Sequence, residues 1–269
     1  MGCNGRVWSA PGNGAQCYSL TMSFVYVFAA TAMEAKALGR GATRGRSGSG
    51  ASEGPPGAGG PNTFELFITG IGPRAARSCS TQVIEPFRHG KRPDAALVIG
   101  TCGSLSPQRH EGEIVVYTKC LPVSVNKQPL VCAKALAGTL NERLDGCGIS
   151  YARVAGITSD RMAATPEEKL RWARMGAEVV DMESYEIVEV MAGAGIPVAV
   201  VRAVSDSLDR GLPDFNPALR ANGEVDKLAA ARIAARSPLH TMRFVMLHRK
   251  AVESLRTALD CLLSADFLP

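Results

Sequence analysis

The chain has 269 residues, of which 46% are hydrophobic, 20% are charged and 6% are aromatic, and its formal net charge is +5. This length and composition are typical of a globular protein with one sizeable core. The basic residues occur in short groups without interleaved aromatic residues, so we expect solvated surface charge and no nucleic-acid partner. No apolar run is long enough to predict a transmembrane helix.

Eight cysteines are scattered along the chain without a C-x-x-C pair or a Cys/His group at zinc-ligand spacing. Several lie in apolar stretches, where a free cysteine packs as a small hydrophobic residue. We therefore predict no metal, no structural disulfide and a reducing compartment, the cytoplasm.

Two segments have compositions that do not favour a packed structure. Residues 1–22 are rich in Gly, Asn and Ser and lack the apolar stretch of a signal peptide, so we expect a disordered leader, with Met22 as an alternative start. Residues 39–61 are almost entirely Gly, Ser, Pro, Ala and Arg, which predicts a flexible loop. Residues 23–269, including this loop, are expected to form a single domain.

Strands and helices are expected to alternate along the rest of the chain. Short apolar runs predict buried strands, whereas capping residues and amphipathic stripes predict helices. In chain order we expect a strand at 24–30, a helix at 31–38, a strand at 64–69, a helix beginning at Pro73, strands at 94–100, 113–118 and 153–157, a helix after the Thr165 cap, a strand at 178–180, a helix at 183–194, a strand at 198–204 and a helix at 239–263. The apolar stripe of the last helix comprises Met242, Val245, Met246, Val252, Leu255, Leu259 and Leu262.

This alternation predicts an α/β fold with a mixed or parallel sheet covered on both faces. Ligands in such folds bind beyond the carboxyl ends of the strands. Three segments place small or acidic residues at that edge, namely residues 100–104, 181–184 and 205–206. They are therefore the first candidates for a functional site.

Asp206 ends the most apolar strand of the chain. A carboxyl group beside an apolar core is expected to have a raised pKa, which suits a general acid. The alternative is that Asp206 caps the next helix.

Two other segments carry weaker signals. Glu183 at a strand-to-helix junction could accept hydrogen bonds from a vicinal diol, with Met182 against the apolar face of a sugar; the alternative is a helix N-terminus. The stretch Thr101-Cys102-Gly103 is expected in a glycine-bearing turn whose N–H groups could hold phosphate or water; the alternative is a plain tight turn.

Several common sites are excluded or disfavoured by the sequence. The Gly70-Ile71-Gly72 stretch lacks the full dinucleotide-binding pattern, and it is not a P-loop. No G-x-S-x-G elbow is present, which disfavours a serine hydrolase. The four histidines are expected to have ordinary surface or capping roles.

Four blocks in order resemble the purine nucleoside phosphorylase / methylthioadenosine–adenosylhomocysteine nucleosidase superfamily. They are VYVFAATAMEA, FITGIGPRAA, DAALVIGTCGSLSPQRHEGEIVV and VVDMES…GIPVAVVRAVSD, and they span residues 24–209. The resemblance implies a three-layer α/β/α sandwich around a twisted mixed sheet, and a homo-oligomer. The stretch TSDRMAATPEEKLRWARMGAEVVDMES is most similar to the hopanoid-associated phosphorylase subgroup, whose members are thought to remove adenine from an adenosyl-hopane lipid.

The resemblance also implies roles for individual residues. Asp206 matches the acid that protonates or hydrogen-bonds N7 of the purine, and Met182 and Glu183 match the ribose contacts. Thr101, Cys102 and Gly103 match the loop between the base and nucleophile pockets, and Met162 and Ala163 match the segment that stacks on the base.

The nucleophile end departs from the family pattern. Lys36 stands where nucleosidases have the glutamate that activates water, although Glu34 could take this role. Val98 stands where bacterial phosphorylases have a phosphate-binding arginine. Arg74 and Arg202 are two alternative phosphate partners, between which the sequence does not decide.

These observations predict an enzyme that cleaves the N-glycosidic bond of an adenine-type nucleoside by hydrolysis or phosphorolysis. No cofactor is expected, with phosphate as a potential co-substrate. The alternatives are a non-catalytic nucleoside-binding module and, on the basic last helix, peripheral contact with a membrane surface.

Overall fold

The computed structural model describes residues 23–38, 43–44, 62–85 and 92–264. The expected leader at 1–22 lies outside the described residues, as does most of the expected loop at 39–61. The two described residues of that loop, Thr43 and Arg44, form the short strand β2, which pairs in parallel with β3.

The described strands form one nine-stranded mixed sheet. β4 pairs in parallel with β1 and β9, and β9 pairs antiparallel with β5. β7 joins β5 to β8, and β8 returns to β4, so that β4, β9, β5, β7 and β8 close into a ring. The strands are β1 (Ser23–Ala29), β2 (Thr43–Arg44), β3 (Asn62–Ile68), β4 (Ala95–Ser104), β5 (Ile114–Pro122), β6 (Leu130–Val131), β7 (Tyr151–Thr158), β8 (Val179–Asp181) and β9 (Val198–Asp206).

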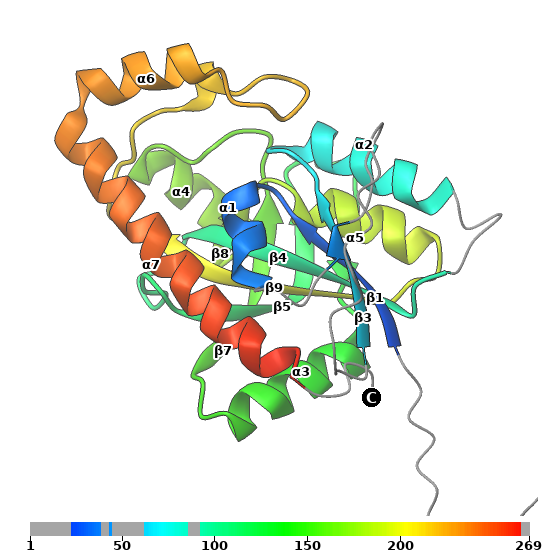
Figure 1. The fold of residues 1–269 in the computed structure, drawn as a ribbon. Helices are drawn as coiled ribbons and strands as arrows, with labels where there is room; N and C mark the ends of the chain where they lie inside the picture. The colour runs from blue at the N-terminus through cyan, green and yellow to red at the C-terminus, as the bar shows by residue number, and fades with distance from the viewer. Residues whose placement is uncertain (1–22, 39–42, 45–61, 86–91, 265–269) are drawn as a thin grey trace, which may run out of the picture.

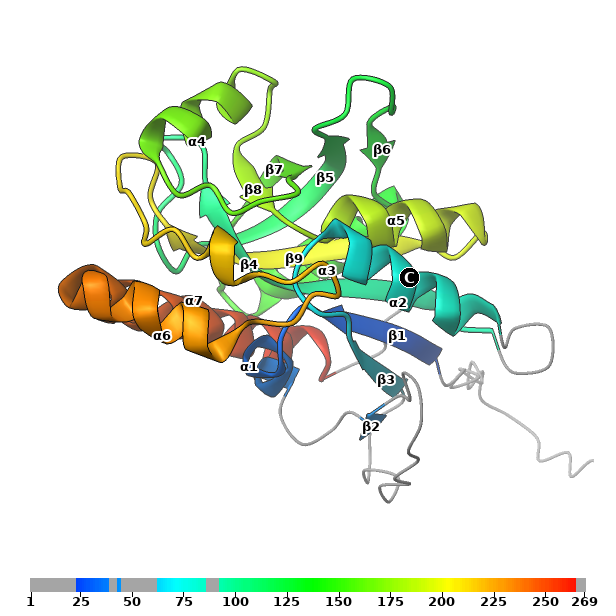
Figure 2. The same ribbon diagram turned by 90° about the horizontal axis from the view of Figure 1, so that it is seen from above.

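Helices cover both faces of the sheet, which confirms the expected three-layer arrangement (Figures 1 and 2). α2 and α5 pack on one face, and α3, η1 and the end of α7 pack on the other. The helices are α1 (Ala32–Ala35), the 3-10 turn η1 (Lys36–Leu38), α2 (Pro73–Ile84), α3 (Lys134–Gly146), α4 (Pro166–Ala173), α5 (Ser184–Gly193), the 3-10 turn η3 (Asn216–Ala218), α6 (Lys227–Arg236) and α7 (Pro238–Leu262).

The local signals in the sequence explain most of these boundaries. Thr31 and Thr165 each form a capping box with the glutamate three residues later, which starts α1 and α4. Pro73 occupies the first turn of α2, where its missing N–H is not needed. The strand β9 is buried along its whole length, as its continuous apolar sequence predicts.

Some predictions were wrong or incomplete. Residues 101–104 continue the strand β4 and do not form a turn, because they pair with β8 and β9. The helices α3 and α6 were not predicted, since Gly138 interrupts the first and alanines dilute the pattern of the second.

The predicted stripe of the last helix is buried only in its second half. Leu255, Leu259 and Leu262 are inaccessible, whereas Met242 and Met246 are 58% and 63% exposed. α6 has no buried residue. α6 and the first half of α7 therefore form an arm, residues 227–250, that lies outside the core (Figure 1).

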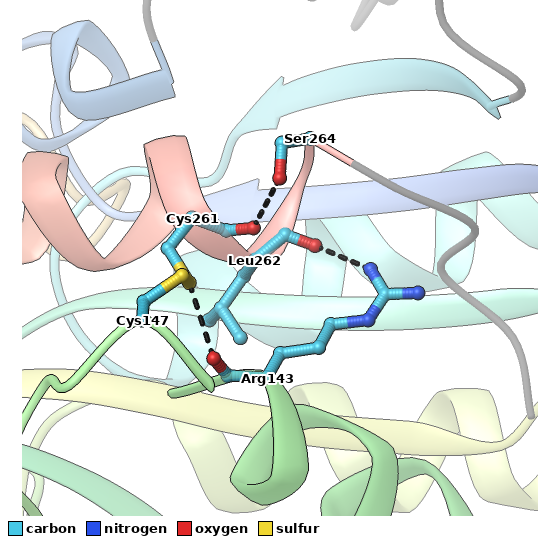
Figure 3. Close-up of a disulfide and its surroundings, with 5 residues drawn as sticks. All are labelled: Arg143, Cys147, Cys261, Leu262 and Ser264. Atoms are coloured by element: carbon cyan, nitrogen blue, oxygen red, sulfur yellow. Dashed lines mark hydrogen bonds between the residues drawn. A yellow bond between two sulfur atoms is a disulfide. The ribbon is translucent and has the colours of Figure 1, made fainter. Parts of the chain in front are cut away.

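A disulfide between Cys147 and Cys261 joins the end of α3 to the end of α7 (Figure 3). Arg143 strengthens the same junction, since its Nη1 donates to the carbonyl of Leu262 at 2.7 Å. The prediction of no structural disulfide was wrong, because residues 114 apart in the sequence are brought together by packing that spacing does not reveal. Four other cysteines, at 79, 102, 120 and 132, are free and buried, as expected.

This bridge should stabilise the fold, because it closes a long loop in the unfolded chain. We expect the Cys147→Ser/Cys261→Ser variant to lose about 2–4 kcal/mol of unfolding free energy, a range typical of native disulfides. Urea unfolding in oxidising and reducing buffer measures this. Wild-type protein in reductant should match the variant, and equal stability of both proteins in oxidising buffer would show that the bridge contributes nothing.

Candidate active site

A cavity of about 160 Å³ opens at the ends of β4, β8 and β9. It lies at the edge of the sheet where the sequence placed the site, and it gathers every predicted site residue. These residues are Glu34, Thr101, Cys102, Gly103, Met162, Ala163, Met182, Glu183 and Asp206.

Asp206 is the last residue of β9 and is only 3% exposed. Its Oδ1 accepts a hydrogen bond from Ser205 Oγ at 2.6 Å, and its Oδ2 accepts one from Lys169 Nζ at 2.5 Å. The apolar sequence of β9 predicts only a hydrophobic environment for Asp206. The structure adds a buried ammonium partner, Lys169 from α4, which no local pattern in the sequence indicates.

Asp181 organises the junction between β8 and α5. Its Oδ1 accepts from Thr158 Oγ1 at 2.7 Å and from the backbone N–H groups of Glu183 and Ser184 at 3.0 Å. Burial disfavours its charge, but Arg202 and these hydrogen bonds outweigh burial and lower the pKa of Asp181. Asp181 thus fixes the backbone from which the Glu183 side chain projects.

Glu183 and Arg202 form a buried pair in the wall of the cavity. Arg202 Nη2 lies 3.3 Å from Glu183 Oε2, and the N–H of Gly72 donates to Glu183 Oε1 at 3.0 Å. Burial raises the pKa of Glu183 to about 7, with Arg202 opposing the shift and Asp181 adding to it. The Gly70-Ile71-Gly72 stretch, excluded as a dinucleotide site, therefore still contributes to this pocket.

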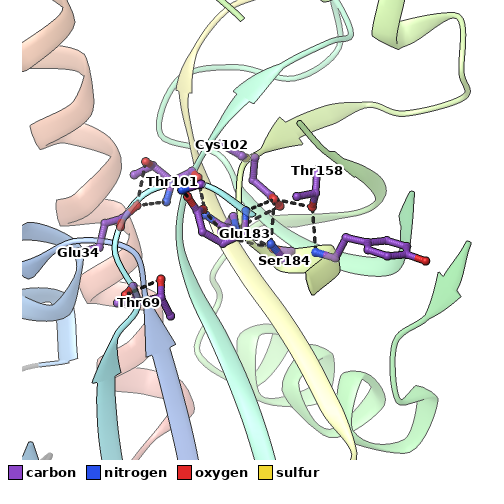
Figure 4. Close-up of polar contacts among 12 residues, drawn as sticks. Glu34, Thr69, Thr101, Cys102, Thr158, Glu183 and Ser184 are labelled. Atoms are coloured by element: carbon purple, nitrogen blue, oxygen red, sulfur yellow. Dashed lines mark hydrogen bonds and ion pairs between the residues drawn. The ribbon is translucent and has the colours of Figure 1, made fainter. Parts of the chain in front are cut away.

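Glu34, on α1, also lines the cavity. Its Oε1 accepts hydrogen bonds from the N–H and the Oγ1 of Thr101, at 2.8 and 3.1 Å, as Figure 4 shows. A Cβ at Gly100 would lie 2.8 Å from both Glu34 Oε1 and Arg202 Nη1. Glycine at this position therefore leaves the room in which the two side chains approach β4.

The residues considered for the nucleophile end differ in where they lie. Glu34 and Arg202 line the cavity, whereas Lys36 and Arg74 are exposed and do not. Val98 is buried in the core. Glu34 thus stands in the pocket that Lys36 does not reach.

His248 on α7 lines the cavity, although an ordinary surface or capping role was expected for it. Its Nδ1 lies 3.5 Å from Thr101 Oγ1, and its ring stacks on Phe244, which also lines the cavity. Phe244 and His248 are four residues apart on α7, so the sequence predicts that they share one face of the helix. It does not predict that this face packs against the edge of the sheet.

Cys102 lines the cavity but is not suited to act as a nucleophile. Burial raises the pKa of its thiol, which keeps it protonated.

Met162 is held by Asn216, whose Oδ1 accepts from the Met162 N–H at 2.7 Å while its Nδ2 donates back to the Met162 carbonyl at 3.0 Å.

A second cavity, of about 490 Å³, adjoins the first and shares Asp206, Leu212 and Phe244 with it. Its wall includes basic and apolar residues of the arm, namely His240, Arg243, Phe244 and Leu247. Within the described residues, no cluster of acidic, His or Cys side chains could hold a metal ion, and none of the helices described there could span a membrane.

Fold and pocket together define an α/β enzyme whose site combines carboxylates and a buried arginine at the ends of strands. Residues 63–237 match the family model of the phosphorylase superfamily, and the chain belongs to this family. Among proteins with curated descriptions, none matches.

Solved structures share the fold at low sequence identity. The futalosine hydrolase of Helicobacter pylori is 16% identical, with a TM-score of 0.64 over 91% of this chain and 98% of that chain. The methylthioadenosine/adenosylhomocysteine nucleosidase of Colwellia psychrerythraea, in complex with adenine, is also 16% identical, with a TM-score of 0.64 over 92% and 98%. That of Neisseria meningitidis, in complex with methylthio-immucillin-A, is 18% identical, with a TM-score of 0.63 over 88% and 98%.

The raised pKa of Glu183 predicts a pH-dependent stability. Between the ordinary pKa of 4.5 and about 7, the folded state binds more protons at Glu183 than the unfolded state, so stability falls as the pH rises. We expect Glu183→Gln to remove up to about 3 kcal/mol of this loss. Urea unfolding of both proteins from pH 4.5 to 8 gives the difference, and parallel curves would contradict the assignment.

Proposed function

We propose that the protein cleaves the N-glycosidic bond of a purine nucleoside. The observation that supports this most is that Asp206 and Glu183 line the same small cavity, whose wall also includes Met162 and Met182. In the proposal, Asp206 enters the step as a protonated carboxyl group and passes that proton to N7 as the C1′–N9 bond breaks, which leaves the carboxylate paired with Lys169. Glu183 accepts the ribose hydroxyls, and its negative charge stabilises the oxocarbenium-like sugar.

Hydrolysis is favoured over phosphorolysis by the charges at the nucleophile end. Arg202 is already paired with Asp181 and Glu183, and Arg161, another basic residue of the cavity wall, is paired with Glu168. Glu34 adds a carboxyl group there, which would repel phosphate when ionised but could take a proton from water. We therefore assign the water-activating role to Glu34, with no cofactor required.

The test is base release from adenosine, inosine and methylthioadenosine, measured by chromatography with and without phosphate. Release without phosphate supports hydrolysis, whereas strict phosphate dependence would replace it with phosphorolysis.

A second candidate function is a nucleoside-binding module without turnover. It is favoured by the absence of the usual nucleophile residues at Lys36 and Val98, and binding of a nucleoside without any product would support it.

Asp206→Asn should lower kcat at least about 10²-fold, because one well-placed acid contributes 10²–10⁴-fold. Asparagine keeps an acceptor for Lys169 but removes its counter-ion, so the variant should also be less stable. Circular dichroism at the assay temperature controls for folding. A folded variant with full activity would exclude Asp206 from the mechanism.

The substrate is further proposed to be an adenosyl lipid of the hopane type, handled at a membrane surface. Two features support this: the sequence resemblance to the hopanoid-associated subgroup, and the arm. The arm has six Lys and Arg residues and no Asp or Glu. It also exposes Leu239, Met242 and Met246.

A homo-oligomer is proposed on the resemblance alone. A cytoplasmic location is proposed too, although the Cys147–Cys261 bridge weighs against it.

If the arm contacts membranes, the protein should float with vesicles that contain phosphatidylglycerol and not with pure phosphatidylcholine, because basic residues add about 1 kcal/mol each near an anionic surface. Arg236→Glu/Arg249→Glu should abolish flotation. Lys119→Glu/Arg171→Glu, with the same change of charge elsewhere on the surface, is the matched control. Equal flotation of the two variants would refute the contact.

A further inference from the structure

We propose that Lys169 is a positioning residue. It orients the carboxyl group of Asp206 and thereby promotes the departure of the base, without touching the substrate itself. This rests on the proposed function and adds a residue to its machinery. Lys169 lies on α4, outside both cavities, and its side chain is inaccessible to solvent.

The contacts of Lys169 all lie on one short segment. Its Nζ donates to Asp206 Oδ2 at 2.5 Å, to the carbonyl of Ser207 at 2.5 Å and to the carbonyl of Arg210 at 3.2 Å. The three donors of the ammonium are thus used on residues 206–210, where β9 leaves the sheet. This segment leads directly to Leu212, which lines both cavities.

With Lys169 in place, both oxygens of Asp206 are fixed. Ser205 Oγ holds Oδ1 and Lys169 Nζ holds Oδ2. A carboxyl group has about four positions on its two oxygens, so a position remains beside these two contacts for the proton that passes to a base in the cavity. The pair therefore sets the orientation of Asp206 without blocking its use.

Packing alone does not account for a lysine at this position. Burying an ammonium removes its hydration, and a hydrophobic side chain of similar volume often replaces a buried ion pair without loss of stability. On α4 the buried residues are Lys169 and Trp172, whereas Leu170 is exposed, so the lysine occupies a core position that a hydrophobic residue would ordinarily take. The functional requirement that fits is a fixed charge beside Asp206.

A double-mutant cycle tests whether Lys169 acts through Asp206. We expect Lys169→Met to lower kcat for nucleoside cleavage at least about tenfold while KM stays within about threefold, since the substrate does not touch Lys169. In the Asp206→Asn background the same substitution should cost no more than about twofold. Arg171→Met, an exposed position on the same helix, is the matched control and should be unchanged.

The leaving group separates positioning of Asp206 from a general structural effect. 4-Nitrophenyl β-D-ribofuranoside and 7-methylinosine release groups that need no proton, so Lys169→Met and Asp206→Asn should each lose less than about threefold on them. A structural lesion would lower cleavage of adenosine and of these ribosides equally. If Lys169→Met does not fold, Lys169→Gln, which keeps a donor but no charge, replaces it throughout the cycle.

Multiplicative losses in the cycle, equal losses on both kinds of substrate, or a folded Lys169 variant with wild-type kcat would overturn the inference. Failure of the proposed function has a different signature. In that case wild-type protein releases no base from any nucleoside, or Asp206→Asn itself is fully active. If Asp206→Asn behaves as expected and the Lys169 variant does not, only the inference about Lys169 fails.

Discussion

The cluster around Arg202 is the interaction on which the rest of the site depends. This guanidinium lies within the sheet at 1% exposure and reaches three separate segments. It pairs with Asp181 and Glu183, donates to Ser184 Oγ, and donates to the carbonyl of Thr101 at 2.9 Å. Removing one partner from such a cluster would leave a buried charge uncompensated, which costs about 3–5 kcal/mol. The positions of β4, β8 and α5 are thereby tied to one another.

This cluster also explains how two carboxyl groups of similar burial differ in charge. Asp181 has four hydrogen-bond donors in addition to Arg202, and its pKa is lowered. Glu183 has a contact of similar length to Arg202 but only one further donor, the N–H of Gly72, and its pKa is raised to about 7. Asp181, which accepts more hydrogen bonds from the protein, keeps its charge, whereas Glu183 titrates near neutral pH. Arg202 thus pairs with one carboxylate that stays charged, Asp181, and with one carboxyl group that titrates near neutral pH, Glu183.

The sequence was sufficient to predict the sheet edge, because the signals there are local. Apolar runs ended by Asp181 and Asp206 predict strands that stop at the site, and the resemblance identifies which side chains face the cavity. Lys169, His248 and the Cys147–Cys261 bridge were not predicted for a common reason. Each depends on how a helix is placed against an element more than 30 residues away, and nothing in a helical pattern states which partner its faces meet.

Glu34 occupies two roles in one turn of helix. Its Oε2 accepts from the N–H of Thr31 in the capping box that starts α1, while its Oε1 accepts from Thr101 inside the cavity. Alanine at this position would therefore remove the capping box of α1 and the carboxylate of the cavity together. A loss of activity in this variant could not be assigned to either effect. Glutamine also serves in capping boxes. It would preserve the start of the helix while removing the carboxylate, so chemistry and local folding become separable at this residue.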